Sequence, residues 1–529
     1  MRTSPVTATE CRLSSVTGIA PAPGESAPSR ALSIRDPELS PLRVQIGCRS
    51  TFLFALCSFF ALFANNDGTT MLQKYLPFYV RLLKLAMPLV LTQAGQMTVQ
   101  LIDNAMVGHF GTNELAAASF TNNIYIVIML LGLGVFMGVT PLVGHARGAQ
   151  KDLQVAATMK SGFALSALLI PVITLASWAM TWVMPFLGQT AEVVRLAVPY
   201  YRTLVIAIIP FLFFTLLKQI GEGLGNTFVA MAVTILSNLL KVALNYVLIF
   251  GKLGFPRLGL IGAGYATIIS RIAMPLLLYA GLTYLKPIRR YFDLMRTIQA
   301  APHEIIKILR IGIPIAVQLA LEVSSFAFSA VMMGWMGNVS LASHEIAIGL
   351  ASFTFMIANG VAMATTIRVS FQLGTRDFGS IGHVSYSAVH LVLSYMGLCG
   401  LCFLLFRHQL PYIFTVDGRV VAQAASLLTI AALFQLFDGL QIVCLGILRG
   451  FGDVKAPMFI SVFSYMVVGL SVSYLCAFSL KIGPTGIWYG FLAGLGVAGT
   501  LLALRIRRKI HQARGLAHDS AIFSPPSGS

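Results

Sequence analysis

The stretch Met-Val-Gly-His-Phe-Gly-Thr-Asn-Glu-Leu-Ala at residues 106–116 recurs as Met-Met-Gly-Trp-Met-Gly-Asn-Val-Ser-Leu-Ala at residues 332–342. Sliding residues 81–150 onto 307–376 extends this match without a gap, to 14 identities in 70 positions. The shared positions are mostly glycine, proline and small residues, where backbone geometry is decided. The chain is therefore built from two related halves, and a membrane protein of this kind usually carries its substrate between them.

The composition is that of a membrane protein. Of the 529 residues 57% are hydrophobic and only 11% are charged, and the mean hydropathy is +0.80, whereas soluble domains carry about 25% charged residues. Several apolar runs are long enough to cross about 30 Å of hydrocarbon as helices. Examples are Ile124–Pro141, Phe163–Met180 and Met458–Leu475. Nearly the whole chain is therefore predicted to lie in a membrane.

The net charge of +18 is not a sign of nucleic-acid binding, because the basic residues gather in alternate loops. They cluster at 74–84, 147–160, 286–310, 376, 455 and 505–514. The intervening loops hold few, mainly Lys252, Arg257, Arg407, Arg419 and Lys481. This is the positive-inside pattern, which places both termini in the cytoplasm.

The hydropathy pattern predicts an all-α polytopic protein with twelve transmembrane helices. The expected spans are 82–108, 117–145, 156–183, 192–220, 228–250, 259–285, 308–335, 342–371, 382–407, 420–448, 456–478 and 485–505. They form two pseudo-symmetric six-helix lobes. Because six is an even number, the second copy is not inverted, and the repeat is parallel, with its axis along the membrane normal.

The domain boundaries follow from these spans. We expect an N-lobe at 75–285, a basic cytoplasmic linker at 286–307 and a C-lobe at 308–510. Residues 511–529 should form a disordered tail. Residues 1–70 are predicted to be a dispensable leader, disordered or untranslated, in which 1–50 have a disordered composition. The apolar stretch Thr51–Ala64 is too short to span a membrane and is either a signal-like segment or, as we favour, part of an untranslated region that ends before Met71.

The repeat returns at the end of each half as Gly223-Leu-Gly-Asn226 and Gly450-Phe-Gly-Asp453. Neither copy follows a strand or contains the Lys-Ser/Thr pair of a phosphate-binding loop. We therefore interpret both segments as tight turns between helices.

Three acidic residues interrupt the apolar spans: Asp103, Glu322 and Asp438. A charged, unpaired carboxylate in hydrocarbon costs several kcal/mol, so such groups face the bundle interior and usually serve a function. The repeat places Ser329 opposite Asp103 and Gln96 opposite Glu322. An unsymmetrical set of acids favours an ion site in one lobe, although a purely structural role in helix packing is the alternative.

Several motifs, taken together, resemble the MATE (multidrug and toxic compound extrusion) transporters and their NorM-like branch. The first is the acidic segment Leu101-Ile-Asp103-Asn-Ala-Met-Val-Gly108. Others are Leu321-Glu322-Val323 ahead of Ser343-His-Glu-Ile-Ala347, and Phe437-Asp438-Gly439 ahead of Leu448-Arg-Gly-Phe-Gly-Asp453. The resemblance covers roughly residues 75–510.

This resemblance implies a V-shaped pair of lobes that exports organic cations and drugs in exchange for Na⁺ or H⁺. On matching positions, Glu322 and Asp438 would form the cation-coupling site of the C-lobe, and Na⁺ is the metal they would take. Asp103, Asn245 and Thr267 would form a polar network in the N-lobe. No cofactor is implied beyond the coupling ion, and the protein is expected to be a monomer in the lipid of a bacterial inner membrane.

One position departs from the family pattern. Where NorM-like proteins commonly have an asparagine four residues before Asn245, this chain has Lys241. Lys241 lies one helical turn from Asn245, on the same face. We therefore predict that Lys241 pairs with Asp103, and that this internal ammonium replaces a bound cation in the N-lobe.

Other functions fit the sequence less well. A flippase for lipid-linked oligosaccharides, from the wider superfamily, would be expected to line its cavity with several arginines. An intramembrane enzyme would need a nucleophile and base or a metal motif such as His-Glu-x-x-His, and His344-Glu345 lacks the second histidine. A receptor or scaffold would not explain unsymmetrical interior acids.

Overall fold

The computed structural model describes residues 71–522. All described elements are helices, and among them twelve are long and apolar enough to cross a membrane. The predicted leader at 1–70 and the last seven residues lie outside the described part of the chain. Within that part, the number and order of the predicted spans are confirmed.

The N-lobe consists of seven helical segments that make six spans. They are α2 (Met71–Phe110), α3 (Thr112–Met137) with its continuation α4 (Val139–Gly148), α5 (Asp152–Val183), α6 (Ala191–Gly223), α7 (Phe228–Phe250) and α8 (Gly259–Tyr284). A short helix, α9 (Lys286–Thr297), follows α8 and leads into the second lobe.

The C-lobe repeats this order. Its helices are α10 (Pro302–Trp335), α11 (Asn338–Gly374), α12 (Phe378–Leu405), α13 (Gly418–Gly450), a composite span of α14 (Lys455–Val462), η3 (Phe463–Gly469), α15 (Leu470–Tyr474) and η4 (Leu475–Ser479), and α16 (Pro484–Ile522). The segments η3 and η4 are π-helical. Short 3₁₀ turns, η1 (Met184–Phe186) and η2 (Leu410–Ile413), follow α5 and α12.

The two glycine-containing turns are the same structure in both lobes, as predicted. Gly225 and Gly452 have positive φ angles of 73° and 71°, which glycine adopts without steric cost. In each turn the next residue donates its backbone N–H across the helix end, from Asn226 to Gly221 and from Asp453 to Leu448, both at 2.9 Å. This closes the carboxyl end of α6 and of α13 and starts the next helix.

The packing inside the lobes repeats as well. The hydroxyl of Thr140 donates to the carbonyl of Gln219 at 3.0 Å, and that of Thr366 donates to the carbonyl of Gly446 at 2.8 Å. These bonds join α4 to α6 and α11 to α13. The backbone of the two lobes is therefore related in detail, which makes a comparison of their interiors meaningful.

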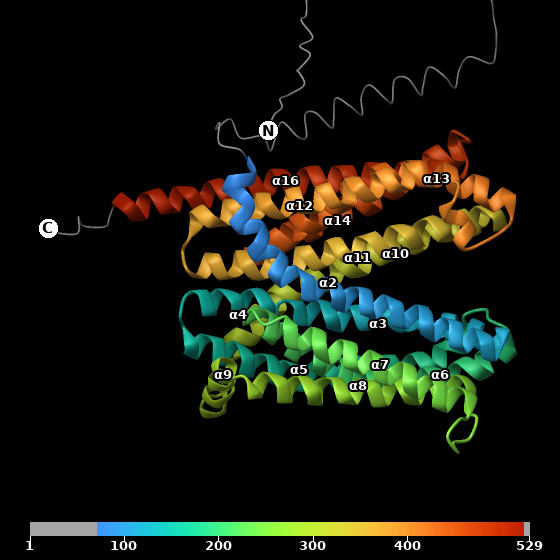
Figure 1. Cartoon of the computed structure of the whole chain (residues 1–529), viewed down its shortest axis with the longest axis horizontal. Coiled ribbons are helices and arrows are strands. Elements are labelled where there is room, and N and C mark those ends of the chain that lie inside the picture. The colour runs from blue at the N-terminus through green and yellow to red at the C-terminus, as the bar shows by residue number, and fades with distance from the viewer. Residues whose placement is uncertain (1–70, 523–529) are drawn as a thin grey trace, which may run out of the picture. The chain divides into compact units, whose positions relative to one another are not determined.

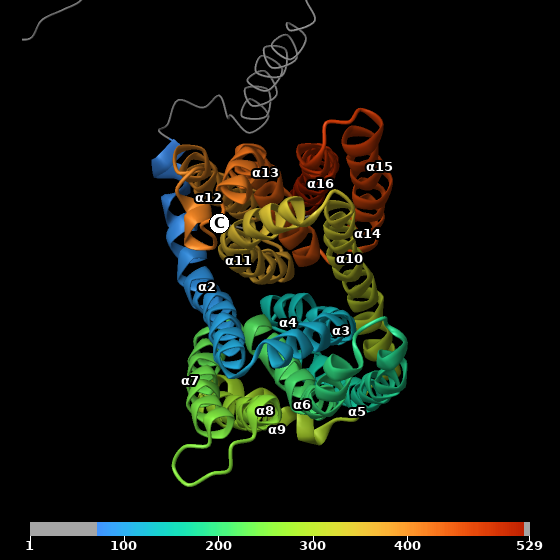
Figure 2. The ribbon, with the colours of Figure 1, turned by 90° about the vertical axis from the view of Figure 1, so that its right-hand side faces the viewer.

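The lobes contact each other through the first and second helices of each lobe. Helix α2 packs on α11, and α10 packs on α3, so the first helix of each lobe lies along the second helix of the other (Figure 1, Figure 2). Glycines allow the backbones to approach. A Cβ at Gly138 would lie 2.8 Å from the Ile308 carbonyl, and one at Gly374 would lie 2.8 Å from the Ala149 nitrogen. These positions lie toward the end of the bundle that carries the basic loops.

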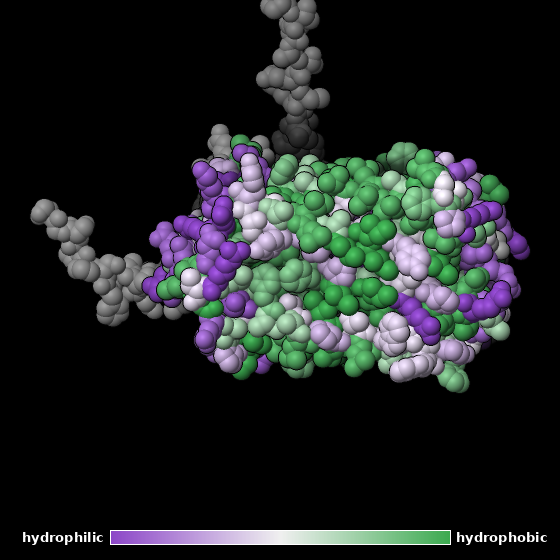
Figure 3. Space-filling view, turned by 90° about the horizontal axis from the view of Figure 1, so that it is seen from below, coloured by the Kyte–Doolittle hydropathy of each residue, from purple (hydrophilic) through white to green (hydrophobic). Residues whose placement is uncertain are grey.

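The surface agrees with a membrane protein. Hydrophobic residues dominate the middle of the face seen in Figure 3, and hydrophilic residues gather toward its two ends. Large apolar side chains are exposed on the helices, such as Leu239 on α7 at 64% and Leu276 on α8 at 65%. Such surface is expected to face lipid.

Two domain boundaries differ from the prediction. The linker at 286–307 is not a plain loop, because it contains α9, whose Ile288, Tyr291 and Phe292 are buried. The predicted tail at 511–529 continues α16 as far as Ile522. The sequence between 511 and 522 has no proline to end the helix before Pro525.

Candidate functional site

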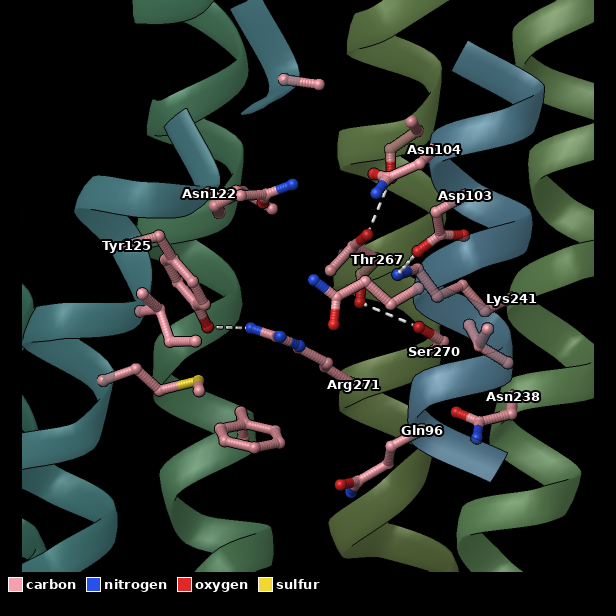
Figure 4. Close-up of a pocket in the computed structure, with 18 of the residues that line it drawn as sticks. Gln96, Asp103, Asn104, Asn122, Tyr125, Asn238, Lys241, Thr267, Ser270 and Arg271 are labelled. Atoms are coloured by element: carbon pink, nitrogen blue, oxygen red, sulfur yellow. Dashed lines mark hydrogen bonds and ion pairs between the residues drawn. The ribbon is translucent and has the colours of Figure 1, made fainter. Parts of the chain in front are cut away.

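Each lobe contains a group of polar and charged side chains in its interior. We call the first the N-lobe cavity. Its volume is about 240 Å³, and it lies among α2, α3, α6, α7 and α8 (Figure 4). The polar lining residues are Gln96, Gln100, Asp103, Asn104, Asn122, Tyr125, Tyr200, Ser237, Asn238, Lys241, Thr267, Ser270 and Arg271.

Asp103 on α2 is fully engaged by α7. The ammonium of Lys241 forms an ion pair with Oδ2 of Asp103, and Nδ2 of Asn245 donates to Oδ1 at 2.5 Å. The side chains of Asp103 and Lys241 are only 20% and 19% exposed. The predicted pairing of Lys241 with Asp103 is confirmed, and the one-turn spacing of Lys241 and Asn245 explains how both reach one carboxylate.

Thr267 on α8 is also where the sequence places it, in the wall of the same cavity. Its hydroxyl donates to the carbonyl of Ala263 at 2.9 Å, within its own helix. Among the hydrogen bonds of the described residues, none joins Thr267 to Asp103. The structure thus brings Asp103, Lys241 and Asn245 into direct contact and leaves Thr267 as a lining residue.

Arg271 was not singled out from the sequence, although it lies in the apolar span of α8. Its guanidinium donates to the hydroxyl of Tyr125 on α3. It also lies 5.1 Å from the centre of the Tyr125 ring and 4.5 Å from that of Phe211. Figure 4 shows Arg271 reaching across the cavity toward Tyr125, away from Asp103. The rule that identified Lys241, a cation within an apolar span, would also have found Arg271.

The second group, which we call the C-lobe acidic cluster, contains Gln318, Glu322, Asp438, Gln441, Arg449 and Tyr465. The two acids come from different helices, Glu322 from α10 and Asp438 from α13, and are 8% and 4% exposed. They are near enough for their charges to interact. The sequence prediction that Glu322 and Asp438 occupy one buried site is consistent with this placement.

Tyr465 joins the cluster from the π-helical segment η3. Its hydroxyl hydrogen-bonds to Oε1 of Gln441 at 2.6 Å and lies 3.4 Å from Oε1 of Glu322. A π-helical turn shifts the register of side chains along a helix and often occurs at functional sites. The sequence gives no simple signal for such a turn, which is why Tyr465 was not expected here.

Arg449 lies at the end of α13, is 6% exposed and interacts electrostatically with Glu322. Its Nη2 contacts Oε1 of Gln318 at 3.5 Å, and its Nε has no hydrogen-bond partner. The cluster therefore holds two acids and one base, the opposite balance to the N-lobe cavity.

The oxygen atoms of the C-lobe acidic cluster suit a small hard cation. Two carboxylates, a phenol hydroxyl and an amide carbonyl are ligands of the type that such ions prefer. No group of three or more His, Cys, Asp or Glu side chains gathers anywhere in residues 71–522.

Comparison with known proteins places the chain in context. The MatE family model matches residues 88–247 and 314–475, one segment in each lobe. The chain is 34% identical to a probable multidrug resistance protein NorM of Mesorhizobium japonicum, over 82% of this chain and 95% of that protein. It is 30% identical to the multidrug resistance protein MdtK of Yersinia pseudotuberculosis, over 82% and 96%.

Solved structures have the same fold. A multidrug resistance MATE family transporter in an outward-facing conformation superposes with a TM-score of 0.76 at 22% identity, covering 85% of this chain and all of that one. The eukaryotic MATE transporter AtDTX14 superposes with a TM-score of 0.73 at 21% identity, covering 83% and 99%. The family model matches both halves of the repeat, and the relatives belong to the family that the sequence motifs resemble.

Proposed function

Since the chain belongs to the MATE transporter family and to its NorM-like branch, we propose that it exports organic cations and drugs across a bacterial inner membrane in exchange for Na⁺ or H⁺. It is a transporter and not an enzyme. We expect it to work as a monomer, without a cofactor, and to be one of the multidrug efflux proteins that its relatives are named for.

The observation that carries the proposal is the pairing of two acids in the C-lobe. Glu322 and Asp438 are buried in one cluster whose only base is Arg449. Two carboxylates and one guanidinium leave a formal charge of −1, so the cluster gains from binding one monovalent cation. Binding of the ion and of a cationic substrate then compete for the same uncompensated charge, which is the basis of exchange.

The N-lobe is proposed to take no coupling ion. Both oxygens of Asp103 are already occupied by Lys241 and Asn245. A second cation at that carboxylate would have to displace the ammonium, which would then lie without a counter-charge in the interior of the lobe at a cost of several kcal/mol. Lys241 therefore acts as a permanent internal counterion.

The orientation of the chain in the membrane follows from the charge on the loops. We propose that the end of the bundle with the basic loops faces the cytoplasm, with both termini there, in keeping with the positive-inside rule. The glycine-mediated contacts at Gly138 and Gly374 lie in the basic half. The lobes are then closed toward the cytoplasm, as in an outward-facing transporter.

The proposal is tested with purified protein in liposomes that contain a fluorescent organic cation. Gradients of Na⁺ and H⁺ are applied separately, each with the membrane potential clamped. We expect one of the two gradients to drive the dye against its concentration difference. Dye movement that ignores both gradients would contradict coupled exchange.

A further inference from the structure

The positive charge of Arg271 is not compensated inside the N-lobe cavity. Asp103 is the one acidic residue in the cavity lining, and both of its oxygens are taken by Lys241 and Asn245. None of the ion pairs among the described residues includes Arg271. With one carboxylate and two cations, the cavity has a formal charge of +1.

The surroundings of Arg271 hold the guanidinium in place without neutralising it. The rings of Tyr125 and Phe211 flank it, and the Tyr125 hydroxyl accepts a hydrogen bond. Contacts with aromatic faces stabilise a cation by about 0.5–2 kcal/mol, which is less than the cost of an unpaired charge in a membrane interior. An anion in the cavity would supply the missing counter-charge.

The cavity lining offers further hydrogen-bond donors. Amide side chains of Gln96, Gln100, Asn104, Asn122 and Asn238 line the cavity. An oxyanion accepts several hydrogen bonds at once, so amide N–H groups of this lining can bind it together with the guanidinium.

The rest of the lining is apolar. It includes Val107, Ile126, Met129, Leu204 and Met274. A small inorganic ion would leave this part of the cavity unfilled, whereas an organic molecule with an anionic end would fill both parts.

We propose that the N-lobe cavity binds the carboxylate, or a related oxyanion, of an amphiphilic substrate on the guanidinium of Arg271. The inference rests on the proposed export function and narrows its substrate class. Zwitterions that carry a carboxylate beside their cationic group are then bound in preference to plain monocations of the same shape.

A matched pair of dyes tests the proposal. Rhodamine 110 carries a free carboxylate, and rhodamine 123 is its methyl ester, so the two differ in one negative charge on the same ring system. Binding of each to the purified protein in detergent is measured by fluorescence anisotropy. Wild type should bind rhodamine 110 roughly tenfold more tightly, which corresponds to one charge-assisted hydrogen bond.

Arg271→Gln should remove that preference and leave the affinity for rhodamine 123 unchanged or higher. Arg271→Lys keeps the positive charge and should retain part of the preference. Arg419→Gln, at an exposed arginine outside the lobes' interior, is the matched control and should behave as wild type. The wild-type ratio needs no variant, so it remains informative if Arg271→Gln does not fold.

Equal affinities in wild type, or an equal loss for both dyes in Arg271→Gln, would overturn the anion site. Rhodamine 123 export that depends on chloride in wild type but not in Arg271→Gln would mean that an inorganic anion occupies the cavity, and this would also overturn the substrate claim. Failure to export either dye under any gradient would instead refute the proposed export function, while the binding ratio still decides the site.

Discussion

The two lobes share a backbone but have opposite charges in their interiors. Gly223 and Gly450 are equivalent positions that close the same turn. Counting 12 residues back from each gives Phe211 in the N-lobe and Asp438 in the C-lobe, and counting 15 residues forward gives Asn238 and Tyr465. At a third equivalent pair, Gln96 replaces Glu322.

Each acidic or hydroxyl-bearing member of the C-lobe acidic cluster thus has a neutral counterpart in the wall of the N-lobe cavity. The lining of the N-lobe cavity instead contains two cations, Lys241 and Arg271. Arg271 packs on Phe211, the residue that stands where the other lobe has Asp438. The repeat preserves the residues that set the fold, and we propose that the interior side chains give the C-lobe a cation site and the N-lobe an oxyanion site.

The largest effect on transport is expected from neutralising the two acids of the C-lobe acidic cluster. Glu322→Gln and Asp438→Asn keep side-chain volume and remove a charge each, so coupled efflux should fall to background while the protein stays in the membrane. Asp417→Asn, at an exposed acid next to Arg419, is the control and should transport normally. Transport is measured in liposomes at fixed protein content.

Normal efflux in both cluster variants would show that the C-lobe does not carry the coupling ion. A loss of folded protein would instead support a structural role for the two acids, the alternative that the sequence left open.

The second prediction concerns the stability of the N-lobe pair. Asp103→Asn leaves the partly buried Lys241 without its counter-charge and should lower the free energy of unfolding by about 3 kcal/mol, whereas replacing both residues, as Asp103→Asn with Lys241→Met, should restore most of it. Thermal unfolding in detergent measures both. Additive losses in the double variant would argue against a coupled pair.

The third prediction concerns a substitution that should create an ion site in the N-lobe. Lys241→Asn removes the internal ammonium and frees one oxygen of Asp103, so one more ion should be exchanged per substrate. The reversal potential of transport in liposomes reports this number. An unchanged stoichiometry would mean that Lys241 does not stand in for a bound cation.

The smallest effect is expected at the contact between the lobes. Gly138→Ala places a Cβ about 2.8 Å from the Ile308 carbonyl, and such overpacking costs about 1–3 kcal/mol. Hydrogen exchange should therefore increase at 134–148 and 308–316. Gly349→Ala, where nothing lies within 4 Å of the added Cβ, should leave exchange unchanged. Identical behaviour of the two variants would mean that this contact does not hold the lobes closed.

The fold could be predicted because each span is apolar and the glycine pattern repeats, so neither depends on long-range contacts. The Asp103–Lys241 pair could also be predicted, because a charged side chain within the membrane is costly unless it pairs with an opposite charge. Thr267 was placed in the right cavity, but its hydroxyl bonds within its own helix, because a threonine can satisfy itself there.

The remainder of the site depends on features that the sequence does not display. Tyr465 reaches Gln441 from a π-helical turn, and hydropathy gives no sign of such a turn. Arg271 was visible as a charge in an apolar span, but its contact with Phe211 follows only from how α6 and α8 pack. The helix α9 within the basic linker is too short and too charged to be predicted as a membrane span, although its buried residues, Ile288, Tyr291 and Phe292, have the i, i+3, i+4 spacing of an amphipathic helix.

The most direct test of the division between the lobes is to measure the ions that leave the protein when substrate binds. Release of H⁺ and of Na⁺ on adding the dye is followed in weakly buffered detergent solution. We expect wild type and the Asp103→Asn, Lys241→Met variant to release the same ion in equal amounts, and Glu322→Gln and Asp438→Asn to release none. Release that survives in the C-lobe variants and disappears in the N-lobe variant would contradict the account.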